Sequence, residues 1–144
     1  MASAAMVTQG TKVEIAKAAT PTVADTLIGD ATGWSGPRFD RTDIDVTNLQ
    51  SVAKEYRVGL KDPGEFTVDV NFNPWDDLGQ KEAWAALDSA TPRKVRLTFP
   101  GTPIKSLEFD AIVKGFESTG APDDKADGTI TFRITGDVVK SPGV

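Results

Sequence analysis

Residues 65–73, EFTVDVNFN, alternate strictly between polar and apolar side chains. Such alternation predicts a β-strand with one face buried and the other in water. Asp62-Pro63-Gly64 lies just before the segment and favours a turn, because proline restricts φ and glycine can take a positive φ. Pro74 follows and ends the strand, since it has no N–H to donate to a neighbour. We therefore expect the chain to be organised around this half-buried strand.

Other alternating segments predict further strands at 11–17, 39–47, 93–99, 106–117 and 129–136. At Gly115 the apolar phase of its segment changes, which predicts a β-bulge or a sharp bend. Two long connections separate the early strands. We interpret 18–38 as a loop with a short strand or turn near Leu27-Ile28, and 48–63 as a loop or a protruding hairpin. Loops of this length often serve a function, so both are expected to pack against something else.

One helix is predicted, over residues 77–88. Asp76 or Asp77 is a suitable N-cap, and Gln80 stands three residues after Asp77, as in a capping box. Trp84 and its neighbours at helical spacing supply an apolar stripe. The pattern as a whole indicates a mostly β, α+β domain with this helix and long loops.

Length and composition narrow the class of protein. A chain of 144 residues suits a single domain, 1–144, whose core needs no covalent staples. Residues 1–10 predict a flexible N-terminal arm and 137–144 a short C-terminal tail. The absence of cysteine and histidine removes disulfides, thiol nucleophiles and the commonest metal ligand. No apolar run approaches the roughly 20 residues of a membrane span.

The sequence contains no catalytic, phosphate-binding or metal-binding motif, so we expect no enzyme activity, no cofactor and no metal. Carboxylate pairs occur at Asp76-Asp77 and Asp123-Asp124. The first pair has a sufficient role as helix cap and dipole partner, and the second lies in a polar turn. A hydrolase that uses either pair ranks behind the other interpretations, because nothing nearby supplies a nucleophile or a metal.

Two tryptophans leave a binding role open. Trp34 lies in the 18–38 connection and either covers the core or anchors a neighbouring subunit. Together with Trp75 it also permits an alternative function, that of a monomeric β-sandwich binding module for a carbohydrate or protein ligand. Trp84 is assigned to the core through the helix stripe.

The outward faces of the strands carry charge unevenly, within a net charge of −5 from 16 basic and 21 acidic residues. This balance argues against a surface that grips nucleic acid, which would be basic. The strands at 93–99 and 129–136 show basic side chains, whereas the other strands show Asp43, Asp45, Glu65, Asp69, Glu108 and Asp110. Two interpretations stay open: ion pairs across neighbouring strands, or an acidic wall past which a polyanion slides without binding.

The order of these segments resembles the major tail tube protein of long-tailed, siphovirus-like bacteriophages, in the tail tube and type VI secretion tube superfamily. The resemblance covers about residues 39–137. It rests mainly on GLKDPGEFTVDVNF and on EFDAIVKGFESTGAPDD, followed by a last strand that ends at Thr135-Gly136. Between them lie the helix after Trp75-Asp76-Asp77 and the strand RKVRLTFP. None of these segments is a catalytic motif, so the match rests on pattern and order.

This resemblance implies a β-sandwich or barrel-like tail tube fold with one flanking helix. It implies a structural virion protein, made in the cytoplasm of the bacterial host, whose hexameric rings stack into a hollow tail tube. DNA would pass through the lumen to the host without sequence-specific binding. The resemblance further implies contact with a tape measure protein, a tail tip or baseplate initiator and a tail terminator.

Two sets of residues are expected to serve such an assembly. Contacts between rings are assigned to the N-terminal arm and to the 48–63 connection, through Lys54, Tyr56, Arg57 and Lys61. The wall of the lumen is assigned to acids on the strand faces, namely Asp43, Asp45, Asp69 and Asp110. Head-to-tail contacts between copies give rings when the rotation closes, and stacked rings give a filament.

Overall fold

The computed structural model describes residues 10–17, 22–50, 52–101 and 104–141. The expected N-terminal arm, 1–10, lies outside this part of the chain apart from Gly10. Within the described residues the protein is mostly β with one helix, α1 (Leu78–Ser89), so the predicted fold class is confirmed.

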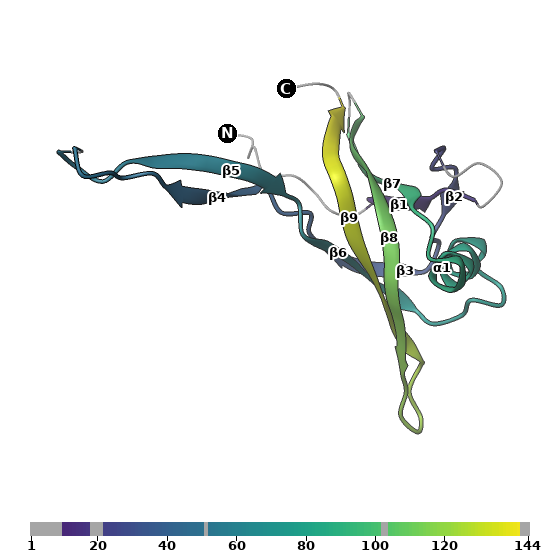
Figure 1. The fold of residues 1–144 in the computed structure, drawn as a ribbon. Helices are drawn as coiled ribbons and strands as arrows, with labels where there is room; N and C mark the ends of the chain where they lie inside the picture. The colour runs from purple at the N-terminus through teal and green to yellow at the C-terminus, as the bar shows by residue number, and fades with distance from the viewer. Residues whose placement is uncertain (1–9, 18–21, 51, 102–103, 142–144) are drawn as a thin grey trace, which may run out of the picture.

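A curled antiparallel sheet forms the body of the protein (Figure 1). Its strands lie in the order β2-β1-β7-β8-β9-β6-β3. In chain order they are β1 (Lys12–Ile15), β2 (Thr26–Leu27), β3 (Ala31–Ser35), β6 (Glu65–Asn71), β7 (Arg93–Phe99), β8 (Lys105–Thr119) and β9 (Asp127–Ser141). A separate hairpin of β4 (Asp40–Asp45) and β5 (Tyr56–Asp62) projects from this body, and we call residues 40–62 the arm.

Aromatic contacts reveal how far the sheet curls. Trp34 on the edge strand β3 packs against Phe99 on β7, with ring centroids 5.6 Å apart, although three strands lie between them in the sheet order. Phe66 on β6 likewise meets Phe109 on β8 at 5.2 Å. The sheet is therefore a half-barrel, with α1 packed against β8 and the β1–β2 side (Figure 1). Trp34 is half-buried against the core, as its interpretation as a cover predicts, and its role as an anchor for a neighbouring subunit stays a prediction.

The strand β6 buries the side chains that its alternation predicts. Phe66, Val68 and Val70 are each at most 1% exposed, and they face the same core as their partners on β9. Burial of side chains of this size stabilises a fold by roughly 1.5–3 kcal/mol each. The register between β8 and β9 shifts next to Gly115, so the predicted bulge is confirmed.

Two parts of the sheet depart from the sequence prediction. Residues 31–35 form β3 inside the segment interpreted as a loop, because they pair with β6 although ATGWS shows no alternation. Residues 137–141, assigned to a C-terminal tail, instead continue β9 and pair with the first residues of β8. The assigned tail is thus largely strand. Gly136, with φ of +80°, interrupts the apolar pattern and hides this continuation in the sequence.

The helix begins at the predicted cap, and the cap also holds a distant turn. Asp77 accepts a hydrogen bond from the backbone N–H of Gly79 at 3.1 Å and from that of Gly29 at 3.1 Å. Gln80 is fully buried and does not complete a capping box. Its side chain accepts from the N–H of Asn73 on the β6–α1 connection and donates to the carbonyl of Asn71 at the end of β6. The helix start therefore joins β6 to the β2–β3 turn.

The arm consists of two paired strands and a connecting tip. Asp43 pairs with Val58 and Asp45 with Tyr56, and residues 46–55 join the two strands at the far end. The strand predicted at 39–47 is confirmed. The hairpin alternative for 48–63 is also confirmed, with β5 as its second strand.

The chain enters and leaves the arm at two closely packed glycines. Gly64 has φ of +74°, as the turn chemistry of Pro63-Gly64 predicts. Gly36 has φ of +92°, and a Cβ added there would lie 2.4 Å from the carbonyl oxygen of Glu65. Both backbone conformations disfavour other residues, so the base of the arm depends on glycine.

Two ion pairs join the base of the arm to β9. Lys61 Nζ lies 3.2 Å from Asp137, and Arg133 Nη2 lies 3.2 Å from Asp62. Hydrogen bonding from Lys61, and then from the N–H of Val138, lowers the pKa of Asp137. The pKa of Asp62 is lowered mainly by a hydrogen bond from the backbone N–H of Gly64. The positive charge of Arg133 lowers it further. These contacts orient the arm relative to the body.

Arg93 is a buried charge on the same face of β7 as Val95 and Leu97. Its side chain is 1% exposed, and Nη1 donates to the carbonyl of Ala16 at 3.0 Å and to the carboxylate of Glu82 at 2.9 Å. A single cation thus joins α1, β7 and the end of β1. Breaking such a contact leaves a buried carbonyl and a mostly buried carboxylate without their donor.

Replacement of Arg93 by methionine is expected to lower the free energy of unfolding by about 2–4 kcal/mol, because the buried partners lose a charged donor. Urea denaturation measures the change. Lys94→Met is the matched control on the same strand. Its ion pair with Asp110 is solvated, so the cost there is expected to stay below about 1 kcal/mol. Equal losses in the two variants would contradict this role for Arg93.

Acid is expected to loosen the base of the arm before the body unfolds. Asp62 and Asp137 have lowered pKa values in the fold, so their contribution is complete above the ordinary aspartate pKa of about 3.9 and is lost as the pH falls through the lowered values. Amide chemical shifts of residues 59–64 should stay constant near neutral pH and move only in acid. The Asp62→Asn, Asp137→Asn double variant should lack the transition, and a midpoint above the ordinary value would contradict the assignment.

Candidate assembly interface

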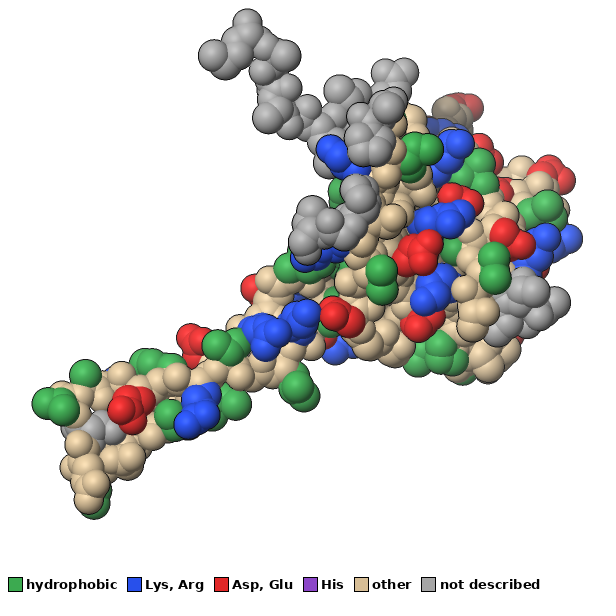
Figure 2. Space-filling model, turned by 90° about the horizontal axis from the view of Figure 1, so that it is seen from above, with side chains coloured by type: hydrophobic (Ala, Val, Ile, Leu, Met, Phe, Trp, Pro, Cys, Tyr) green, Lys and Arg blue, Asp and Glu red, His purple; other side chains and the backbone are tan. Residues whose placement is uncertain are grey.

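The arm exposes apolar side chains although it has no core of its own (Figure 2). Along its two strands more than half of the side-chain surface is exposed at Ile44, Tyr56, Val58 and Leu60. At the tip, Leu49 and Val52 are fully exposed. A lone two-stranded hairpin is at best marginally stable in water, and exposed apolar surface of this kind marks an interaction site. These exposed apolar side chains make the arm the candidate interface of the protein.

The pairing of β4 with β5 places side chains with different expected roles on the same face of the arm. Residues directly opposite each other in an antiparallel pair project from the same face. Asp45 lies opposite Tyr56 and Asp43 opposite Val58, so two expected lumen acids share a face with an expected ring contact. Arg57 lies opposite Ile44 and belongs to the other face.

The other two expected lumen acids lie on the body, apart from the arm. Asp110 on β8 pairs with Lys94 of β7 at 3.3 Å, and the two residues are also direct partners in the sheet. Asp69 on β6 accepts a hydrogen bond from the hydroxyl of Thr129 at 3.2 Å. The interpretation of cross-strand ion pairs is thus confirmed for Asp110. It also holds for Glu108, which lies 3.4 Å from Arg96.

The expected ring contacts occupy three different positions on the arm. Lys54 lies exposed beside the tip, Tyr56 and Arg57 start β5, and Lys61 is engaged with Asp137 at the base. Sequence reasoning missed Leu49 and Val52 at the tip. A usable signal was present, because 46–53, VTNLQSVA, is an uncharged stretch within a hairpin that otherwise carries many charges.

The two tryptophans considered for ligand binding lie in separate groups of aromatic residues, and Trp75 stays 67% exposed. Trp34 packs with Phe99, whereas Trp75 belongs to a separate group with Phe72 and Trp84. Asp123 adopts a left-handed conformation, φ of +63°, in the β8–β9 turn. Across the described ranges, no group of three or more acidic, histidine or cysteine residues is placed to hold a metal. In the same ranges no helix is long and apolar enough to cross a membrane.

Solved structures with this fold come from viral and virus-like tubes. The chain resembles a chain in the structure of an extracellular contractile injection system, the PVC sheath/tube terminator in the extended state, with a TM-score of 0.73, 13% identity and coverage of 98% and 99% of the two chains. It resembles the tail of an empty gene transfer agent particle, of C6 symmetry, with a TM-score of 0.68, 14% identity and coverage of 88% and 93%. For the SPP1 tail tube the TM-score is 0.68, with 14% identity and coverage of 94% and 78%.

Comparison with curated protein sequences gives no match. The family model described as phage tail tube, TTP, lambda-like matches residues 4–143. That span includes the body and the whole arm, and the fold agrees with the tubes named above. The chain therefore belongs to the lambda-like family of phage tail tube proteins.

Proposed function

We propose that six copies of this chain form a ring and that the rings stack through the arm into a hollow tube for DNA. As a phage tail tube protein, the chain is a structural part of the virion. Support for a ring of six comes from the gene transfer agent tail, which shares this fold and has C6 symmetry. A structural role requires no catalytic site.

The observation that carries the proposal is the exposed apolar surface of the arm. Tyr56 and Val58 form a small apolar patch flanked by Asp43 and Asp45, and Leu49 and Val52 extend it at the tip. Arm and body are different surfaces, so contact between them is head-to-tail. After two copies have met, each still has one of the two surfaces free, so the contacts continue from ring to ring.

Within this contact the residues of the arm take different parts. Tyr56 supplies the large amphipathic surface that often anchors an interface, while Lys54 and Arg57 supply charge at its rim. Asp43 and Asp45 join the same contact, because they share the face of Tyr56. Lys61 acts indirectly by holding the arm against Asp137 of β9.

We assign the wall of the lumen to the polar outer face of β6, β9 and β8, where Asp69 and Asp110 lie. Many basic side chains on the outer face of the sheet already form ion pairs with acidic ones, as Lys94 and Arg96 do. A wall of this kind repels a polyanion weakly and offers it few unpaired cations. The tape measure protein would occupy this lumen, and the tail tip initiator and the terminator would contact the two ends of the tube.

Shortening the arm is expected to abolish tubes and leave the body folded. Asp43 and Val58 are direct partners, so Asn-Gly in place of residues 44–57 closes a two-residue hairpin between them. Negative-stain electron microscopy across a concentration series should show rings of six and tubes for the natural chain. The shortened variant should give no tubes at any concentration.

The shortened variant needs a check on folding. Its thermal unfolding should remain cooperative, because the buried residues of the core all lie in the body. A variant shortened in the β8–β9 turn, with Gly-Gly in place of residues 120–126, controls for loss of a second projecting turn. Unchanged tubes without the arm would overturn its assignment to ring stacking.

Lumen-facing residues are expected to be shielded from large reagents in the tube. In the Asp69→Cys variant, a small maleimide should react with free subunits and with tubes, whereas a maleimide on a large polymer should react only with free subunits. Asp88→Cys, on the exposed side of α1, is the control and should react with both reagents in both states. Equal labelling of the two cysteines by the large reagent in tubes would contradict the lumen assignment.

A further inference from the structure

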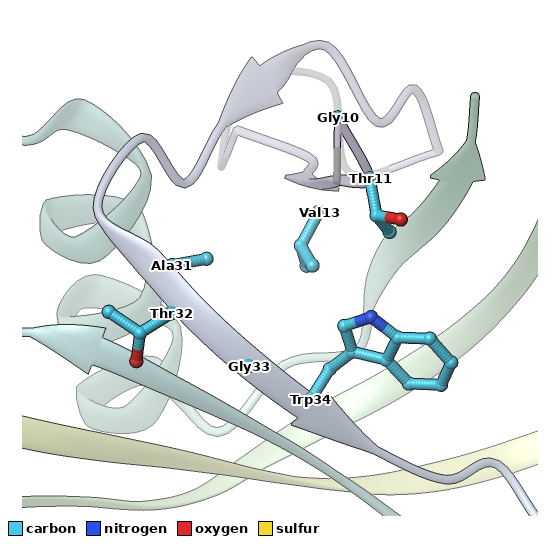
Figure 3. A pocket seen from close by; sticks show the side chains of 7 residues that line it. All are labelled: Gly10, Thr11, Val13, Ala31, Thr32, Gly33 and Trp34. Carbon is cyan, nitrogen blue, oxygen red and sulfur yellow. The ribbon is translucent and has the colours of Figure 1, made fainter. Parts of the chain in front are cut away.

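A pocket of about 530 Å³ opens at the seam of the half-barrel, between β1 and β3 (Figure 3). Its lining includes Val13, Ala31 and Trp34, and none of the residues that line it is charged. Figure 3 shows the side chain of Ala31 directed toward the pocket and that of Thr32 directed away from it. Pockets of this volume commonly receive groups larger than one side chain. The pocket at the seam is therefore an uncharged candidate binding site at the edge of the core.

Two polar groups lie at this pocket, and one of them has no partner within the described structure. The hydroxyl of Thr11 is buried and has no hydrogen-bond partner there. The indole nitrogen of Trp34 lies on the side of the ring turned toward Thr11 in Figure 3. Polar groups placed among apolar ones give a pocket its specificity. An occupant that carries an amide as well as apolar side chains would satisfy this pocket.

The tip of the arm has this chemistry. Its stretch 46–53 is uncharged, Leu49 and Val52 are fully exposed, and Gln50 adds a carboxamide. The neighbouring parts of the arm are charged, beginning at Asp45 and Lys54 on the two sides of this stretch. An uncharged tip and an uncharged pocket match without leaving a charge buried and unpaired.

The pocket and the tip lie on opposite sides of the molecule. In Figure 1 the arm extends to one side of the β8–β9 hairpin, and β1, β2 and β3 lie on the other side. The tip therefore points away from the pocket of its own chain. A second copy, displaced along the direction of the arm, presents its pocket to that tip.

We propose that the arm tip of one copy seats in the Trp34 pocket of a copy in the next ring. Leu49 and Val52 pack against Trp34 and Ala31, and the oxygen of the Gln50 carboxamide accepts from the indole N–H of Trp34. This inference rests on the proposed stacking role of the arm, and it names the surface that receives the arm.

Disulfide trapping tests the contact directly, because the chain has no cysteine. Copies that carry only Leu49→Cys are mixed with copies that carry only Ala31→Cys, assembled into tubes and oxidised. A crosslinked dimer is expected in tubes and not in unassembled subunits, since a disulfide requires Cα atoms within about 7 Å. Copies with Asp124→Cys replace the Ala31→Cys partner as the control and should crosslink at least tenfold less.

A matched pair of variants on β3 tests the same contact without crosslinking. Ala31→Glu places a charge in the pocket from an exposed position, so it should leave the fold intact and slow tube growth at least tenfold. Ser35→Glu adds the same charge on the same strand at an exposed position that does not line the pocket, and it should change tube growth less than twofold. Light scattering follows growth, and thermal unfolding confirms that both variants fold.

The outcomes separate this inference from the proposed function. Tubes that need the arm but grow normally with Ala31→Glu, and show no crosslink from Leu49→Cys to Ala31→Cys, would overturn the pocket as receptacle and leave the stacking role intact. Normal tubes without the arm would overturn both. A crosslink from Ser3→Cys to Ala31→Cys in place of the expected one would assign the pocket to the N-terminal residues and also overturn the inference.

Discussion

The direction of the arm depends on a strand that is held on both edges in the body. β6 continues from β5 across Pro63-Gly64, pairs with β9 on one side and with β3 on the other, and buries Phe66, Val68 and Val70. A strand hydrogen-bonded on both sides cannot tilt without breaking its ladders. The arm therefore inherits its orientation from the core, although it contributes nothing to that core. The ion pairs to β9 act at the same place and restrain rotation about the bend.

Buried and exposed charges have separate tasks in this protein. Arg93 is inaccessible to water and joins α1, β1 and β7, so its contribution is to the stability of the body. The pairs of Lys61 and Arg133 at the arm are about half exposed, so salt screens them and each adds little free energy. Weak pairs are nevertheless sufficient to select a direction for a hairpin that has few other contacts. Stability can therefore reside in the body while the arm stays adaptable.

Local pattern predicts much of this fold because most of its core strands carry their own alternation. The central strand, the helix with its Asp77 cap and the bulge at Gly115 all follow from neighbouring residues. β3 and the end of β9 do not, because ATGWS and DVVKS become strands only through their partners on β6 and β8. The same limit applies to the site. That Asp43 and Asp45 share a face with Tyr56 depends on the pairing of β4 with β5, and that register includes an irregularity between Arg41 and Asp43.

A projecting hairpin with free edges is a hazard for aggregation, and the distribution of charge on the arm addresses it. Edge strands attract other strands unless charged side chains interrupt them. The paired strands of the arm, which form its shaft, carry the charged residues Arg41, Asp43, Asp45, Arg57 and Lys61. The apolar residues without adjacent charge are confined to the tip, where the backbone no longer forms a ladder. Nonspecific pairing along the shaft is thereby disfavoured, while the tip keeps the surface that a shaped pocket can recognise. Selectivity of this kind requires a repulsive element as well as an attractive one. The two are separated here along a single hairpin, with the charges on its paired strands and the uncharged residues at its tip.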